Sequence, residues 1–329
     1  MGAMRAFAVR LLRNLFWGLT VFSVGVVCAH AGEVPAMVRK QVPAYYRILL
    51  GQFEITALLD GVMEVDKAVL TNEEPERLQR ILAERYVDAS RIQVAVNVYL
   101  VHTGSRLVLV DAGCGGLFGK KMGQVVSNMR AAGYLPEQVD TVLLTHMHGD
   151  HLGGLVTKAG KKVFPNATVY VDQQESDFWL STENEKKAPA YLERNFRAAR
   201  TVSGPYRASG KWKTFRQESE IVPGIHAVAA PGHTPGHTLF KVVSGGQELY
   251  ILGDLVHSHS VQFAYPDVAV AYDSDQKQAV ITRRKIFGLA AQSGWFVAGM
   301  HLPYPGVGRI RSNGDDSYTW IPSPFTPLP

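Results

Sequence analysis

The sequence predicts an α/β protein whose strands and helices pack in layers as one domain, and three observations predict this class. Short apolar stretches rich in Val, Ile, Leu and Tyr, each bounded by Gly, Pro or Asp, recur along the chain and are typical of strands. Stretches with helical spacing lie between some of them. No repeat, low-complexity tract or long linker divides the 329 residues. Strands with interspersed helices pack as layers around one core, so we expect a single domain.

Each expected element follows from local composition. In chain order, the expected strands are 53–59, 94–101, 107–111, 141–145, 168–171, 226–230, 249–252 and 295–298. A helix is predicted over 120–132, because Gly133 is suited to end it. A second helix is predicted after Ser274, because its spacing places one set of residues on a single face. These residues are Ala279, Arg283, Ile286, Phe287 and Ala290.

Residues 1–31 have the features of a secretory signal peptide. Three arginines and no acid precede a mostly apolar run over 15–27. The segment ends at Ala29-His30-Ala31, a small-x-small cleavage site. The run is shorter than the ~20 residues that a membrane-spanning helix needs. We therefore expect cleavage after Ala31, export to the periplasm, no stable membrane anchor after cleavage, and one mature domain, 32–329. An uncleaved N-terminal anchor is the alternative.

Net charge and cysteine content narrow the classes of function. The chain carries +5 overall, but residues 32–329 have 31 basic and 29 acidic residues, for a net charge of +2. Nine basic residues and one acid concentrate in 186–216, as either a solvated helical insertion or a surface that attracts anions. The rest of the mature chain is acidic, which argues against a nucleic-acid partner. Cys114 is the single mature cysteine, so no internal disulfide can form.

Three histidines and one aspartate fall within six residues directly after a predicted strand. They form the motif H-x-H-x-D-H, with His146, His148, Asp150 and His151. From one loop, the first two histidines can reach one ion, while the aspartate and the third histidine can reach a second ion nearby. Imidazole and carboxylate groups suit zinc or a related divalent metal. These four residues are therefore candidate metal ligands.

Three further candidate ligands lie at strand ends. They are His233 in the segment Pro-Gly-His-Thr-Pro-Gly-His, Asp254 after the strand 249–252, and His301 after the strand 295–298. A carboxylate such as that of Asp254 can bridge two cations. Five histidines and two aspartates are enough for two divalent ions about 3.5–4 Å apart, with open positions. We expect two divalent metal ions, with zinc as the first choice, and a bridging hydroxide near neutral pH.

The order of these motifs resembles the metallo-β-lactamase superfamily over residues 53–301. The resemblance implies an αβ/βα sandwich of two mixed sheets flanked by helices. It also implies two metal positions that share Asp254. One position would be held by His146, His148 and His233, and the other by Asp150, His151 and His301.

A closer resemblance, to methyl parathion hydrolases and lactone-hydrolysing relatives such as dihydrocoumarin hydrolases, spans nearly the whole mature chain. It is carried by residues 45–51, 53–58, 107–111 and 177–181 and by the Pro-Gly after His301. It implies an exported dinuclear metal hydrolase that forms a homodimer. It also implies an aromatic substrate pocket of Phe118, Trp179 and Phe196. For the last two, packing in the core is the alternative.

Two departures from the family pattern bear on the substrate. Asp254 is present and the mature cysteine precedes the metal motif, which disfavours β-lactam hydrolysis. His257 stands where methyl parathion hydrolases have Leu and acyl-homoserine lactonases have Tyr. A donor beside the metals can polarise a lactone carbonyl or hold an oxyanion. A supporting or solvent-facing histidine is the alternative.

The sequence therefore predicts a metal-dependent hydrolase of lactones or aryl esters, in which a metal-bridging hydroxide attacks the carbonyl. Asp150 or Asp254 would pass a proton to the leaving oxygen, and His257 would contact the substrate. Organophosphate triester hydrolysis in the same pocket is the alternative reaction. The expected partners are a small-molecule lactone, aryl ester or organophosphate and a second copy of the chain. The complete ligand set disfavours a non-catalytic metal-binding scaffold.

Overall fold

The computed structural model describes residues 34–328, so the predicted signal peptide lies outside the described residues. The chain divides into Met1–Val42 and a main unit, Pro43–Pro329. The helices and strands of the described part all belong to the main unit. In residues 34–328, no helix is long and apolar enough to span a membrane.

Seven strands form the first mixed sheet, in the order β1-β2-β4-β5-β6-β7-β8. Their bounds are β1 (Tyr45–Leu50), β2 (Phe53–Val65), β4 (Ile92–His102), β5 (Leu107–Val110), β6 (Thr141–Leu143), β7 (Thr168–Asp172) and β8 (Trp212–Phe215). Neighbours from β1 to β5 are antiparallel, whereas β5, β6, β7 and β8 run parallel. The loops that follow β5, β6 and β7 therefore begin at one edge of the sheet.

Seven more strands form the second mixed sheet, in the order β16-β15-β14-β12-β11-β10-β9. Their bounds are β9 (Glu220–Val222), β10 (Ile225–Ala229), β11 (Thr238–Ser244), β12 (Gln247–Ile251), β14 (Phe296–Ala298), β15 (Val307–Ser312) and β16 (Tyr318–Pro322). β12 and β14 are parallel, and the other neighbours are antiparallel. A small ribbon pairs β3 (Leu70–Thr71) with β13 (Ala269–Val270).

The helices connect and cover these sheets. They are α1 (Pro75–Ala83), α2 (Val125–Ala131), α3 (Gly149–Leu152), α4 (Gln173–Leu180), α5 (Thr182–Lys187), α6 (Glu193–Ala208), α7 (His259–Gln262) and α8 (Gln276–Ser293). Short 3₁₀ turns are η1 (Lys67–Val69), η2 (Pro136–Gln138), η3 (Gly153–Leu155), η4 (Ala190–Leu192) and η5 (Gly253–Leu255). The basic segment 186–216 runs through α5, α6 and β8.

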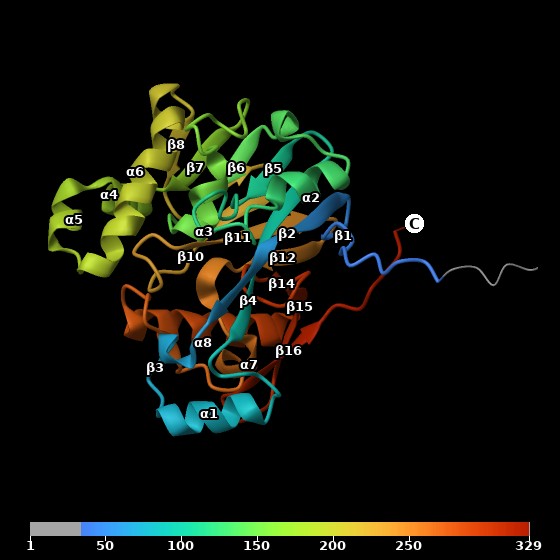
Figure 1. The fold of residues 1–329 in the computed structure, drawn as a ribbon, viewed down its shortest axis with the longest axis vertical. Helices are drawn as coiled ribbons and strands as arrows, with labels where there is room; N and C mark the ends of the chain where they lie inside the picture. Colours follow the sequence, from blue (N-terminus) through green and yellow to red (C-terminus); the bar gives the residue numbers. More distant parts are fainter. Residues whose placement is uncertain (1–33, 329) are drawn as a thin grey trace, which may run out of the picture. The chain divides into compact units, whose positions relative to one another are not determined.

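The two sheets pack face to face, with helices on both outer sides (Figure 1). In β5, alternate residues face opposite layers, as the pleat of a strand requires. Val108 and Val110 share a core with Phe240 of the second sheet, whereas Leu109 packs with α2, α4 and α6. On the other side, Phe287 of α8 packs against the second sheet. The predicted αβ/βα sandwich of two mixed sheets is confirmed.

Element bounds differ from expectation where distant contacts act. The helix predicted over 120–132 begins only at α2, because the buried Asp60 carboxylate accepts hydrogen bonds from the amides of Gly123 at 2.9 Å and Val125 at 3.2 Å. These bonds hold the preceding residues in a loop. The helix predicted after Ser274 is α8, which Asp275 caps by accepting from the Gln278 amide. In residues 34–328, eight strands lie outside the ranges expected from local composition: β1, β3, β8, β9, β11, β13, β15 and β16.

Candidate metal centre

The loop after β6 supplies four of the predicted ligands: His146, His148, Asp150 and His151. The buried Thr145 amide and hydroxyl both donate to the Asp111 carboxylate at 2.8 Å, which fixes the chain where it leaves the sheet. The short helix α3 then begins directly after His148. Two histidines thus precede the helix, and the other two ligands lie in its first turn.

The second sheet supplies the other three ligands from loops that follow its strands: His233 after β10, Asp254 after β12 and His301 after β14. The His233 loop lies close to α8, because a Cβ on Gly232 would overlap the backbone of Ala279. The φ of 131° at Gly232 also favours glycine. Since β12 and β14 are parallel neighbours, Asp254 and His301 leave the sheet at the same edge.

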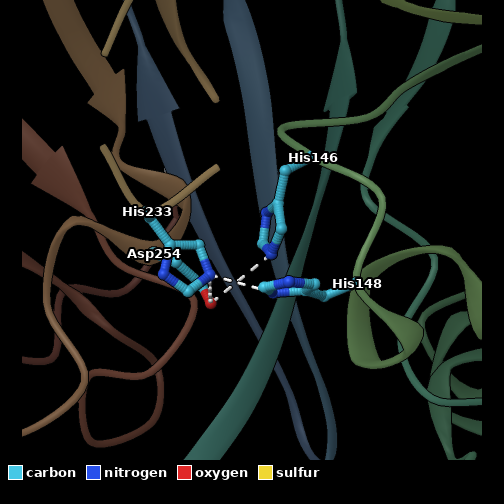
Figure 2. A group of neighbouring side chains, drawn as sticks. All are labelled: His146, His148, His233 and Asp254. Atoms are coloured by element: carbon cyan, nitrogen blue, oxygen red, sulfur yellow. Dashed lines mark hydrogen bonds and ion pairs between the residues drawn. The ribbon is translucent and has the colours of Figure 1, made fainter. Parts of the chain in front are cut away.

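One cluster, here called the first ligand group, contains His146, His148, His233 and Asp254. Their ligand atoms lie within 4.8 Å of one another, and Figure 2 shows the four side chains pointing toward one another. His233 Nε2 is 3.0 Å from His148 Nδ1 and 3.2 Å from Asp254 Oδ2. His146 Nε2 is 3.6 Å from the same carboxylate oxygen. All four side chains are buried.

The second ligand group contains Asp150, His151 and His301, whose ligand atoms also lie within 4.8 Å of one another. His151 Nε2 and His301 Nε2 are each 3.5 Å from Asp150 Oδ2. Asp254 connects the two groups, since its Oδ1 is 3.2 Å from His301 Nε2 and its Oδ2 faces His233. The structure therefore brings all seven predicted ligands to one place, with Asp254 between the groups.

The donor atoms fit two divalent cations. His146 Nε2, His151 Nε2 and Asp254 Oδ1 are buried and make no hydrogen bond of acceptable geometry in the described part of the chain, although the last two lie 3.0 Å apart. A buried polar atom without a partner is costly. Metal ligation would satisfy these atoms, and imidazole and carboxylate are the ligands that divalent transition metals take. The side chains therefore form a binuclear His/Asp site.

In two of the histidine ligands, a neighbouring carboxylate bonds to Nδ1, the ring nitrogen that faces away from the metal site. His151 Nδ1 lies 2.7 Å from Asp111 Oδ2, and His233 Nδ1 lies 2.8 Å from Asp273 Oδ1. Such bonds fix the tautomer and direct Nε2 toward the metal. The position of Asp111 at the end of the predicted strand 107–111 makes it a candidate for this role from sequence. Asp273 has no comparable signal, because it meets His233 only through the fold.

Burial and neighbouring charges shift the pKa values of the ligands in both directions. Burial raises the pKa of the Asp254 carboxyl, but the charges of His151 and His301 outweigh burial and leave that pKa well below its usual range. Burial, together with the charge of His233, lowers the pKa of His148 to about 3. These are the forms that bind a metal ion, an ionised carboxylate and a neutral imidazole. For His151 and His233, burial lowers the pKa but the charge of Asp254 outweighs it and raises the pKa, to about 9 for His233, so a metal ion that binds there displaces protons.

His257 lies beside the shared carboxylate. Its Nε2 is 3.0 Å from Asp254 Oδ2, and its ring stacks on His301 with 5.2 Å between centroids. Burial lowers the pKa of His257 to about 4. Asp254, His257 and His301 also form a third group of ligand atoms within 4.8 Å, so His257 is placed to contact a metal ion, and its contact with a substrate stays a prediction. Tyr272, for which the sequence gives no signal, lies edge-on to His257 at 5.2 Å.

The three predicted pocket aromatics lie in different environments. Phe118 is 39% exposed, and its ring lies 3.1 Å from where a Cβ on Gly149 of the metal motif would stand. Trp179 of α4 and Phe196 of α6 are fully buried in the core, as the core-packing alternative requires. Trp179 is edge-on to His148 at 5.2 Å. Substrate contact by Trp179 or Phe196 stays a prediction.

A pocket of about 560 Å³ lies beside the His233 loop. Gly232 and Thr234, on either side of His233, line it together with Asp273. Phe178 and Lys187 also line it, and they belong to the helical segment that begins with α4. The basic segment 186–216 therefore contributes one cation to a cavity that adjoins the metal centre.

Comparisons with known proteins agree with this geometry. A family model described as metallo-beta-lactamase superfamily matches residues 91–292. The solved structure of hydrolase AbOPH, of the beta lactamase superfamily, is 40% identical with a TM-score of 0.84, over 88% of this chain and 100% of that chain. The dizinc quorum-quenching lactonase AidC, solved with a homoserine product, is 28% identical with a TM-score of 0.81, over 86% and 99%.

A curated N-acyl homoserine lactonase from Bacillus thuringiensis is 26% identical over 114 residues. This match covers 35% of the present chain and 37% of the lactonase, so it spans little more than a third of that relative. The family match, the near-complete structural overlap with two hydrolases and the assembled His/Asp site point the same way. The chain belongs to the metallo-β-lactamase superfamily, and it is a dinuclear metal-dependent hydrolase related to the quorum-quenching acyl-homoserine lactonases.

Proposed function

We propose that this protein hydrolyses lactones and aryl esters at a dizinc centre. The observation that carries the proposal is the position of His257, whose Nε2 lies 3.0 Å from the shared Asp254 carboxylate. A polar ring at this place can hold the oxyanion of a tetrahedral intermediate. The 28% identity to a dizinc lactonase, over 86% of the chain, supports both the metal and the substrate class.

The position of each residue suggests its role in the reaction. When bound, two zinc ions supply Lewis acidity to the scissile carbonyl and lower the pKa of the attacking water. Asp254 keeps the two ligand groups together, and His257, beside that carboxylate, would hold the oxygen that becomes negative. Asp150 is the most exposed carboxylate of the centre, with 14% of its side chain accessible, so it can take a proton from the attacking water and pass it to the leaving oxygen. A phenolate leaving group needs little such help.

Phosphotriester hydrolysis, the reaction of the methyl parathion hydrolases that the sequence resembles, is the second candidate. The half-exposed ring of Phe118 beside the metal motif favours it, because a flat aromatic surface suits an aryl leaving group. The same ring would also hold an aryl ester. The same pocket could therefore serve both reactions, and the kcat/KM values for the two substrate classes distinguish them.

A panel of substrates tests the assignment. Zinc-loaded protein would be assayed with dihydrocoumarin, an acyl-homoserine lactone, phenyl acetate, methyl parathion and a cephalosporin, and kcat/KM compared. The highest values are expected with a lactone or the aryl ester, and no turnover is expected with the cephalosporin. If methyl parathion gave the highest kcat/KM, the second candidate would replace the first.

We also propose that the mature protein is periplasmic and dimeric. The N-terminal sequence pattern supports export with cleavage after Ala31.

An interface between copies is supported by exposed apolar side chains at the edge of the second sheet and in the C-terminal segment, which include Ile321, Phe325 and Leu328. N-terminal sequencing of protein from the periplasmic fraction tests the cleavage site. Light scattering tests the dimer, and a monomer at micromolar concentration would contradict it.

A further inference from the structure

A buried carboxylate outside the metal centre joins the two loops that carry the histidines of the first ligand group. Glu175, in the first turn of α4, is fully buried. Its Oε1 accepts the backbone amide of Met147 at 2.9 Å, and its Oε2 accepts the amide of Gly236 at 3.0 Å. Met147 separates the two histidines of the H-x-H motif, and Gly236 lies three residues after His233. One side chain thus bonds to both loops.

The surrounding chain is built for this contact. Asp172, at the end of β7, caps α4 by accepting the amide of Gln174 at 2.8 Å, which places Glu175 in the first turn. A Cβ on Gly236 would overlap the backbone of Glu175, so a glycine is needed for the His233 loop to approach α4. The close approach and the two amide bonds are independent observations of the same connection.

Trp179 completes the arrangement. Its indole N–H donates to Glu175 Oε1 at 2.7 Å, and its ring is edge-on to His148. The partners of Glu175 named so far are all N–H donors, so the side chain must accept at both oxygens. A glutamine of the same shape would set its own NH₂ against one of these donors. The carboxylate is therefore specific to this task.

The second ligand group is supported from other elements. His151 Nδ1 bonds to Asp111, which follows β5, and His301 Nδ1 lies 2.8 Å from the carbonyl of Ala95 in β4. These supports do not come from α4. The two ligand groups are thus oriented by different parts of the first sheet and its connections.

We propose that Glu175 is a positioning residue for the metal held by the first ligand group, and that it leaves the metal of the second group largely unaffected. The carboxylate keeps the two loops at the separation that one ion requires. Partners of this kind change metal affinity when they are removed. The inference rests on the binuclear centre of the proposed function and not on its substrate, so metal binding tests it rather than turnover.

The test compares Glu175→Gln with Asp60→Asn. Asp60 is the matched control, because it is also a buried carboxylate that accepts three backbone amides, from Cys114, Gly123 and Val125, which are not ligands. Zinc affinity at each position is measured by competition with a chromophoric chelator, and the Co²⁺-substituted proteins are compared by absorption. Glu175→Gln should weaken one of the two zinc constants about 10–100-fold and spare the other. Asp60→Asn should spare both, although its melting temperature falls.

The outcomes separate the inference from the proposed function. Wild-type protein that binds fewer than two ions would contradict the binuclear function, and the inference with it. Two unchanged constants in Glu175→Gln, or two constants that fall together, would contradict the inference alone. Gly236→Ala provides a second route if Glu175→Gln is not recovered folded, because the added Cβ forces the same loop from α4. It should weaken the same constant, and an unchanged constant would overturn the inference.

Discussion

His257 distinguishes this centre from one lined by an apolar side chain at the same place. Its ring is buried against His301 and Tyr272, and its Nε2 faces Asp254. Burial lowers its pKa to about 4, so the ring without metal is neutral at neutral pH and carries one N–H that can be donated. Attack on a carbonyl concentrates negative charge on one oxygen, which a single donor can stabilise.

The variant His257→Leu should therefore lose more lactone turnover than phosphotriester turnover. Removal of one oxyanion donor costs about 10²–10³-fold in kcat, so a loss of that order is expected with dihydrocoumarin. A smaller loss, or a gain, is expected with methyl parathion, because an apolar side chain leaves room for a bulky triester. Steady-state kinetics with both substrates, at matched zinc content, measure the difference. Equal losses would remove the role given to His257.

Phe118 is the exposed aromatic next to the metal motif, and its loss should raise KM for aryl substrates. Contact with an aromatic ring contributes about 1 kcal/mol, which corresponds to about a fivefold change in KM for phenyl acetate. Phe325→Ala is the control, because that ring is also exposed but belongs to the C-terminal segment. An unchanged KM in Phe118→Ala would show that substrate does not reach this ring.

At the scale of elements, helix α8 and the His233 loop depend on each other. The loop passes so close to the start of α8 that a side chain on Gly232 would overlap Ala279. The Asp275 amide also donates to the carbonyl of Gly232 at 2.9 Å, and the Thr282 hydroxyl donates to the carbonyl of Pro231 at 2.7 Å. The helix thus fixes the loop that carries one metal ligand.

Alanine at two glycines should have opposite effects on this pair of elements. Gly232→Ala should lower the midpoint of unfolding and reduce zinc content, because the loop must move and φ is positive. Gly288→Ala, inside α8, meets only the Tyr318 hydroxyl at 3.6 Å and should raise stability by about 0.5–1 kcal/mol. Urea unfolding of both variants measures the changes. Destabilisation of similar size in both would contradict this account of the loop.

At the scale of the whole molecule, the metal centre connects the two sheets. The first ligand group takes two histidines from the loop after β6 and its other two members from the second sheet. A metal bound there holds the sheets together at one edge, whereas the apolar core holds them elsewhere. Because the ligands are assembled only in the folded chain, metal binding adds to folding stability.

Removal of metal should therefore lower the melting temperature as well as abolish turnover. At a free zinc concentration 100 times the dissociation constant, each ion stabilises the folded state by about 2.7 kcal/mol. Calorimetry before and after dialysis against a chelator measures the loss, and added zinc should reverse it. Chelator saturated with zinc beforehand is the control. An unchanged melting temperature after complete metal removal would show that the ions do not stabilise the fold.

Much of the fold and centre can be predicted from local patterns, and the limits are specific. The metal motifs are contained in short segments, and the strands that precede them are bounded by turn residues, so the sequence predicts both correctly. The strand that follows the His233 segment, β11, was not predicted. Asp273, Tyr272 and Glu175 could not be placed, because each meets the centre through a contact between residues at least 15 positions apart in the chain. The late start of α2 has the same origin, since Asp60 acts from a distant strand.

Residue type and spacing were sufficient for the class of fold, the seven metal ligands and the hydrolytic chemistry, because ligand chemistry and strand or helix period are local properties. Contacts between distant segments settled the rest. They buried Trp179 and Phe196, left Phe118 exposed, and joined the two histidine loops through Glu175. The physical reason is that burial and hydrogen-bond partners depend on which surfaces the folded sheets bring together. Local sequence patterns do not state which distant segments come into contact.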